Sequence, residues 1–305
     1  MNDEFKCIIC GYTGGGIETR FRPRDRKELK ILDCPKCGHR QLFPLLSDEE
    51  LAEEYNEDKT VRSEVLKIAP GSDFESMRKK FAEWTLMHAD MYWDKLQECG
   101  NVLNIGSGYG FLEEEFNKRP GKKFNIEGDD IGRFRIENYV GGVCHNINFM
   151  TEKIPDDMVG KYDLVMGLHI LEHINSPVDY LSKLKPLFKE QMGRLIIEVP
   201  NLNCFLSELS SEYKEFFYLY EHVSYFTEKT LRETISRAGY TVTAIYTKEL
   251  YSIENHLNWI RTGKPFVQYN QMFLPDKRLE FINEDYKKKV EEMGKGFALI
   301  AEAAF

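Results

Sequence analysis

The sequence NVLNIGSGYG, residues 101–110, is the strongest indication of the fold class of this chain. It begins with an apolar run typical of a buried parallel strand and continues into three glycines at alternate positions. Glycine lets the backbone turn sharply and approach a ligand closely, because it carries no side chain. Residues 111–118 have a helical pattern, so we expect a ligand tail at the N-terminus of that helix.

A second strand is expected at 123–127, with the carboxylate of Glu127 at its end, about twenty residues after the glycines. In nucleotide-binding α/β folds, an acid at this place accepts hydrogen bonds from ribose hydroxyls. A dinucleotide fingerprint would place its third glycine at position 111, which is Phe111 here. The spacing is therefore wrong for NAD.

The rest of the chain alternates apolar strand patterns with helical ones, as in an α/β protein built on a parallel sheet. Further strands are expected at 142–147, 162–166, 194–199, 241–245 and 297–302. Helices are expected at 74–96, from Pro177 to about Phe188 after a Ser176 cap, and at 228–238 after a Thr227 cap.

Length and charge limit the classes of function. The 305 residues allow one large α/β domain and a small accessory module, and the formal charge of -9 counts against nucleic-acid binding. Residues 20–30 are the exception, because they carry an excess of arginine and lysine. They form either a small basic face or, in the interpretation we favour, a solvated hairpin. No membrane-spanning run and no secretory signal pattern is found, which predicts a cytoplasmic protein.

Two CxxC knuckles, with 23 residues between them, supply Cys7, Cys10, Cys34 and Cys37. This spacing is typical of a four-thiolate zinc ribbon, in which a closed coordination sphere makes the metal structural rather than catalytic. Two disulfides or a redox CxxC are the alternatives, and a reducing cytosol disfavours the disulfides. His39 is expected on the surface and not as a fifth ligand.

Several segments together resemble class I S-adenosylmethionine-dependent methyltransferases over roughly residues 100–250: 102–111, Glu127, 162–165, 169–173 and 193–201. The resemblance implies a Rossmann-like seven-stranded methyltransferase sheet and S-adenosylmethionine as cofactor. It implies these contacts: Gly106, Ser107, Gly108 and Gly110 at the methionine tail, Glu127 at the ribose, Asn146 and Ile147 beside the adenine, and Leu168 and His169 beside the sulfonium.

The resemblance extends to the N-terminus. The run CPKCGHRQ at 34–41, followed by Leu51 and the YNED run at 55–58, is similar to the subset with an N-terminal zinc ribbon, which includes deoxysugar-nucleotide C-methyltransferases. That subset carries a Glu-His pair after strand five, and this chain has Tyr220-Glu221-His222 there.

The chain is expected to divide into a zinc ribbon at 1–46, a helical linker and lid at 47–100, and a methyltransferase domain at 101–305 with a helical insertion at about 250–294. Tyr55 is a candidate lid residue over the cofactor, or an ordinary residue of an amphipathic helix. His256 and Trp259, in the insertion, are candidates for setting substrate choice.

Methyl transfer requires a group that takes a proton from the acceptor, and histidine suits this task near neutral pH. His222 is the first candidate, with Glu221 orienting its ring, and His173 is the second. Each could instead have a packing role, since His222 lies in an aromatic-rich run and His173 follows the fourth strand of the sheet.

Three functions stay open at this point. The first is methyl transfer to a small molecule, such as a sugar nucleotide or another metabolite of a glycan or secondary pathway. The second is an RNA methyltransferase whose ribbon docks on RNA, which the acidic charge disfavours. The third is a noncatalytic module that keeps the cofactor fold.

Overall fold

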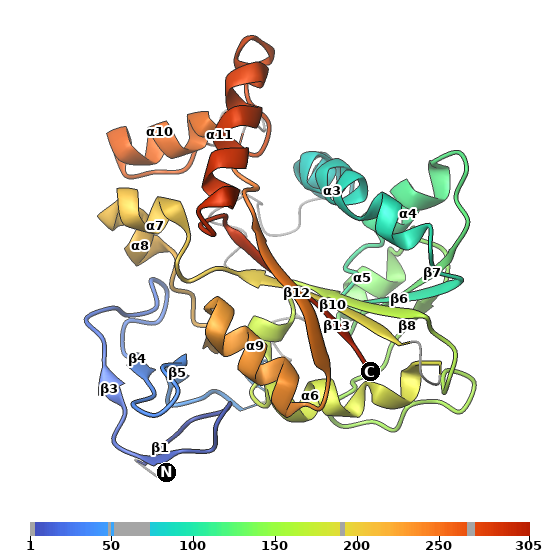
Figure 1. The fold of residues 1–305 in the computed structure, drawn as a ribbon, viewed down its shortest axis with the longest axis horizontal. Coiled ribbons are helices and arrows are strands. Elements are labelled where there is room, and N and C mark those ends of the chain that lie inside the picture. The colour runs from blue at the N-terminus through green and yellow to red at the C-terminus, as the bar shows by residue number, and fades with distance from the viewer. Residues whose placement is uncertain (1–3, 48–49, 52–73, 190–192, 267–271) are drawn as a thin grey trace. The chain divides into compact units, whose positions relative to one another are not determined.

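The computed structural model describes residues 4–47, 50–51, 74–189, 193–266 and 272–305 (Figure 1). The expected lid residue Tyr55 lies outside these ranges. The chain forms two compact units. The first unit comprises Met1–Ser47, Leu171–Asp179 and Glu198–Ala301, and the second comprises Asp48–Ile170, Tyr180–Ile197 and Glu302–Phe305.

The expected seven-stranded sheet is confirmed, with the strand order β12-β13-β10-β9-β6-β7-β8. Its strands are β6 (Asn101–Ile105), β7 (Asn125–Asp129), β8 (Cys144–His145), β9 (Leu164–Leu168), β10 (Arg194–Pro200), β12 (Thr241–Lys248) and β13 (Ala298–Ala304). In the second unit, β6 runs parallel to β7 and β9, with Leu103 opposite Glu127 and Val165. All five residues of β9 are buried, which explains its uninterrupted apolar sequence.

Several strands begin or end a few residues from the expected positions. The wrong boundary that bears on the site is the end of the second strand. The second strand of the chain's α/β pattern, β7, ends at Asp129 and not at Glu127, so Gly128 lies inside it. A side chain at Gly128 would lie 2.1 Å from Tyr139 Oη, because that ring packs directly on the strand. Glycine therefore serves close packing here and does not end the strand.

The expected helices are largely confirmed. α3 (Phe74–Leu96) and α4 (Phe111–Lys118) lie side by side in the second unit, as Figure 1 shows. α9 (Glu228–Arg237) begins at a Thr227 cap, whose side chain accepts from the backbone N–H of Thr230. α6 (Pro177–Lys183) is shorter than expected and gives way to the 3₁₀ turn η2 (Lys185–Leu187), since Pro186 cannot continue an α-helix.

The remaining helical segments are short or belong to the insertion. They are α5 (Arg133–Glu137), η1 (Leu171–His173), α7 (Phe205–Leu209), α8 (Ser211–Phe216), α10 (Ile253–Thr262), η4 (Lys277–Leu279) and α11 (Glu280–Glu292). Within the described residues, no helix combines the length and the apolar character needed to cross a membrane.

The N-terminal segment forms two small sheets in the first unit. β1 (Phe5–Lys6) pairs with β2 (Thr13–Gly14). The second sheet has the order β11-β5-β4-β3, from β3 (Ile17–Glu18), β4 (Lys30–Asp33), β5 (Arg40–Phe43) and β11 (Ser224–Tyr225). Because β11 belongs to a distant part of the chain, the ribbon is built into the first unit and is not an appended module.

Two expectations about the ribbon were wrong. His39 is completely buried, and burial lowers its pKa to about 3, so the ring is neutral and packs against Phe226. The stretch 20–30 is not simply a solvated hairpin. Arg24 lies 3.8 Å above the Phe216 ring and donates to the Phe216 carbonyl, which fixes this stretch to the segment before His222.

Candidate functional site

The glycine turn, residues 106–110, follows β6 and has the backbone that its sequence predicts. Gly106, Gly108 and Gly110 have φ values of 73°, 63° and 75°, which disfavour any residue with a side chain. A side chain at Gly106 would also lie 2.9 Å from Ile170. Each glycine is therefore required by the turn itself.

Three backbone N–H groups of the turn donate to the end of β7. The N–H groups of Gly106 and Ser107 donate to the Asp129 carbonyl at 2.8 and 2.9 Å, and Gly108 N–H donates to Asp130 Oδ2 at 2.9 Å. Asp130 Oδ1 also accepts from Gly132 N–H at 2.7 Å. The carboxylate that directly contacts the glycine turn is thus Asp130.

Glu127 has a different environment from the one expected of a ribose ligand. Lys161 Nζ and Tyr162 Oη donate to its carboxylate at 2.7 and 2.6 Å, and His145 Nε2 lies 2.8 Å away. Burial alone would raise the pKa of Glu127, but these three partners lower it to about 2. Its carboxylate is therefore already satisfied by the protein.

Sequence reasoning missed Asp130. The run Glu127-Gly128-Asp129-Asp130 offered three acids, and the strand was ended too early at the glycine. The signal that could have identified Asp130 is its place directly after the strand, where open α/β sheets bind ligands.

Two further acids near the turn are buried. Burial raises the pKa of Asp129 to about 8, with Asp130 adding to the shift, although Ile147 N–H donates to its Oδ1 at 2.9 Å. Burial also raises the pKa of Glu113 to about 7, although Asn104 donates to this carboxyl at 2.6 Å. Burial thus favours the neutral, protonated form of both carboxyls, so neither adds a full negative charge beside the turn near pH 7.

Asp129→Asn is expected to stabilise the fold increasingly as pH rises. The pKa of Asp129 is raised on folding from 3.8 to about 8, so its stabilising protonated form is fully present at low pH and is lost towards pH 8. The free energy of unfolding of the variant minus that of the wild type should grow by a few kcal/mol over this window. Denaturant titrations at several pH values measure it, and parallel pH profiles would contradict the assignment.

The residues expected around adenine and sulfonium lie in the second unit. Asn146 Nδ2 donates to the Asp130 carbonyl at 2.9 Å, and Ile147 is tied to Asp129, so both lie beside the acids that follow β7. Leu168 ends β9 and is buried. His169, the next residue, is the one described non-glycine residue with a positive φ, 55°. Such local strain is often found at functional sites.

The candidate acid-base residues lie in the first unit and form the Glu172–His173–His222 cluster. The rings of His173 and His222 meet edge to face with centroids 4.8 Å apart. His173 Nδ1 lies 2.9 Å from the backbone carbonyl of Glu221, and its Nε2 lies 3.9 Å from Glu172 Oε1. The structure thus brings the two candidate histidines together and adds Glu172, which the sequence interpretation passed over inside the run HILEH.

Tyr220 and Glu221 hold the segment in place. Tyr220 is buried, its N–H donates to Asp25 Oδ1 at 3.1 Å, and Arg26 lies over its ring. Glu221 supplies its backbone carbonyl to His173, which fixes the orientation of that ring.

The ribbon supports the two residues that follow His222. Leu42 N–H donates to the Val223 carbonyl at 3.0 Å, and Ser224 pairs with Gln41 in the β11–β5 ladder. The buried His39 Nε2 lies 3.3 Å from Ser224 Oγ. The backbone on the C-terminal side of His222 is therefore a strand of the ribbon sheet.

The four ribbon cysteines fit a zinc ion. Cys7 Sγ lies 3.6 Å from Cys37 Sγ, and Cys10 Sγ lies 3.6 Å from Cys34 Sγ, with all four sulfurs within 4.8 Å of one another. A tetrahedral zinc ion with Zn–S bonds of about 2.3 Å holds its sulfurs roughly 3.8 Å apart. None of the four forms a disulfide, which excludes the disulfide alternative for this structure.

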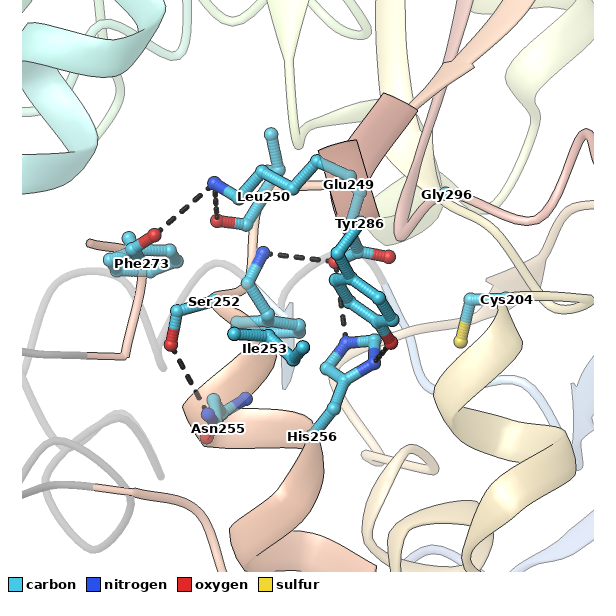
Figure 2. A network of polar contacts seen from close by, with 12 residues as sticks. Cys204, Glu249, Leu250, Ser252, Ile253, Asn255, His256, Phe273, Tyr286 and Gly296 are labelled. Carbon is cyan, nitrogen blue, oxygen red and sulfur yellow. Dashed lines mark hydrogen bonds and ion pairs between the residues drawn. The ribbon is translucent and has the colours of Figure 1, made fainter. Parts of the chain in front are cut away.

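The insertion is held by a buried polar network (Figure 2). Glu249 and His256 are 3% and 2% exposed, with His256 Nε2 3.5 Å from Glu249 Oε1. The hydroxyl of Tyr286 contacts His256 Nδ1 and joins α11 to α10. Trp259 is also buried, in an aromatic cluster. Both candidates for setting substrate choice are thus buried within the first unit.

Residues 73–245, more than half of the chain, match the family described as a methyltransferase domain. The chain belongs to this methyltransferase family. Over 108 residues this chain is 30% identical to the ubiquinone biosynthesis O-methyltransferase of Pseudomonas aeruginosa strain UCBPP-PA14, covering 33% of this chain and 45% of that protein. The matched part spans less than half the length of that relative.

Two solved structures share the fold of this chain. A SAM-dependent methyltransferase from Archaeoglobus fulgidus is 18% identical with a TM-score of 0.50, and the match covers 76% of this chain and all of that one. A possible histamine N-methyltransferase from Thermotoga maritima is 13% identical with a TM-score of 0.51, covering 76% of this chain and 93% of that one. At these identities the likeness concerns the fold alone.

Proposed function

We propose that this chain transfers a methyl group from S-adenosylmethionine to a small-molecule acceptor. The observation that carries the proposal is the glycine turn, with Asp130 joined to it, in a chain of the methyltransferase family. When bound, S-adenosylmethionine supplies an electrophilic methyl group on a sulfonium sulfur.

Different residues of the second unit would bind different parts of the cofactor. Gly106, Ser107, Gly108 and Gly110 would cradle the methionine tail, and Asp130 would accept hydrogen bonds from the ribose in place of Glu127. Asn146 and Ile147 would border the adenine, and Leu168 and His169 the sulfonium. Asp130 is preferred at the ribose because it directly follows β7 and accepts from the glycine turn at Gly108.

Asp130→Asn is expected to weaken S-adenosylmethionine binding by about tenfold or more, because a charge-assisted hydrogen bond contributes about 1.5–3 kcal/mol. Glu127→Gln, its matched control, should change the dissociation constant by less than about twofold. Isothermal titration calorimetry measures both. A larger loss of S-adenosylmethionine affinity in Glu127→Gln than in Asp130→Asn would instead support Glu127 as the residue that binds the ribose.

Proton removal from the acceptor is assigned to the pair His222 and His173, with His222 as the first candidate for the base. The orientation of His173 comes from the Glu221 backbone carbonyl. The ribbon, holding a structural zinc ion on its four cysteines, would fix the strand that follows His222. The two histidines, Glu221 and the four cysteines all belong to the first unit.

The acceptor class that we propose is a sugar nucleotide or a related metabolite, processed in the cytoplasm. The observation behind this choice is the ribbon with the Glu-His pair beside it, which the structure joins through β11. An acidic chain whose arginines at 22, 24 and 26 contact its own side chains offers little to a nucleic acid, so RNA is a poorer candidate. A screen of sugar nucleotides and phosphorylated metabolites for S-adenosylhomocysteine release tests the choice. A purified protein that retains RNA would overturn it.

A further inference from the structure

The Glu172–His173–His222 cluster has the composition and spacing of a cation site. Each residue offers one ligand atom, and these atoms all lie within 4.8 Å of one another. Ligands bound to one ion at about 2.0–2.2 Å lie roughly 3 to 4 Å apart, so small side-chain movements would bring the three onto a common ion. A carboxylate with two imidazoles is a frequent ligand set for divalent transition metals.

The surroundings hold the ligands as a metal site requires. Glu172 and His173 are 1% and 8% exposed and lie on the short η1 turn. His173 Nδ1 lies 2.9 Å from the Glu221 carbonyl, and an N–H donated to this acceptor leaves the lone pair on Nε2. That nitrogen is the one 3.9 Å from Glu172 Oε1. In metal-binding histidines, the N–H of the second ring nitrogen commonly donates to a backbone carbonyl in this way.

We infer that Glu172, His173 and His222 bind one divalent transition-metal ion, separate from the zinc of the ribbon. Imidazole and carboxylate ligands favour ions such as Zn²⁺, Mn²⁺ or Fe²⁺ over Ca²⁺, which prefers oxygen ligands alone. Three protein ligands leave positions open on the ion, as in catalytic rather than structural sites.

The use of this ion rests on the proposed methyltransferase function. An acceptor hydroxyl that occupied an open position would have its pKa lowered, and its proton would pass to solvent while the ion held the resulting oxyanion. The two histidines would then be ligands and not bases. The acceptor would then be a molecule with a hydroxyl at the reacting position, and the methyl group would be transferred to its oxygen.

Mn²⁺ is the probe that separates the two metal sites, because its preference for nitrogen and oxygen ligands keeps it from a thiolate ribbon that already holds zinc. Electron paramagnetic resonance should show one equivalent of bound Mn²⁺ in the zinc-containing wild-type protein. Glu172→Gln and His222→Asn should weaken that binding by more than tenfold. The control His145→Asn changes a histidine of the second unit and should leave it intact.

A wild-type protein that binds no Mn²⁺, and carries no metal beyond the ribbon zinc by elemental analysis, would overturn the inference, whether or not the variants fold. Calorimetry with S-adenosylmethionine on the same samples separates this failure from that of the proposed function. If the protein binds S-adenosylmethionine but not Mn²⁺, the metal site is contradicted and the proposed histidine base is retained. If it binds Mn²⁺ but not S-adenosylmethionine, the proposed methyltransferase function is contradicted and the metal site is retained.

Discussion

Cys37→Ser is expected to release the ribbon zinc and to loosen residues 216–226 together with the ribbon. Structural zinc contributes on the order of 10 kcal/mol of folding free energy, more than so small a segment gains from its own core. Residues 216–226 should loosen with the ribbon because Ser224 pairs with Gln41 and Arg24 donates to the Phe216 carbonyl. Zinc analysis and limited proteolysis with mapped cleavage sites measure the two effects.

The matched control is Cys144→Ser, which changes a cysteine of the second unit outside the ribbon. It should retain zinc and resist cleavage in both regions. Protease sites confined to the N-terminal 46 residues of Cys37→Ser would show that the ribbon folds apart from the His222 segment. That outcome would contradict its proposed supporting role.

His222→Ala is expected to lower kcat by about 10²- to 10⁴-fold, the usual range for a group that handles the acceptor proton. The dissociation constant of S-adenosylmethionine should change by less than about twofold, since the glycine turn and Asp130 belong to the second unit. Glu221→Gln should lower kcat by less than about tenfold, because the contact to His173 comes from the backbone. Release of S-adenosylhomocysteine with the acceptor found by screening measures kcat.

Full turnover in His222→Ala would remove both roles proposed for this side chain, base and metal ligand. A parallel loss of turnover and cofactor affinity would instead point to general damage of the fold. Comparison with Glu221→Gln separates the loss of kcat caused by removing the imidazole from any loss caused by a displaced segment around His222.

Local sequence patterns predicted most of the secondary structure. The strand before the glycine turn, the glycines themselves and the Thr227 cap each depend on a few neighbouring residues, and all are found as expected. The end of β7 was misjudged because it depends on the packing of Tyr139 against Gly128, which brings together residues that sequence alone does not relate.

The pairing of β11 with β5 also could not be predicted. Each strand is short, and Ser224 and Gln41 are far apart in the chain, so no local pattern signals their contact. The same holds for the Glu172–His173–His222 cluster, whose members come from η1 and from the loop before β11. The candidate histidines were identifiable by residue type, but their proximity required the fold.

The most direct test of the central claim is a calorimetric titration of the purified protein with S-adenosylmethionine. We predict saturable binding of one molecule per chain, retained in His222→Ala and weakened about tenfold or more in Asp130→Asn. Gly108→Val, which places a side chain where φ is 63°, should abolish it. A folded wild-type protein that binds no S-adenosylmethionine would contradict the account.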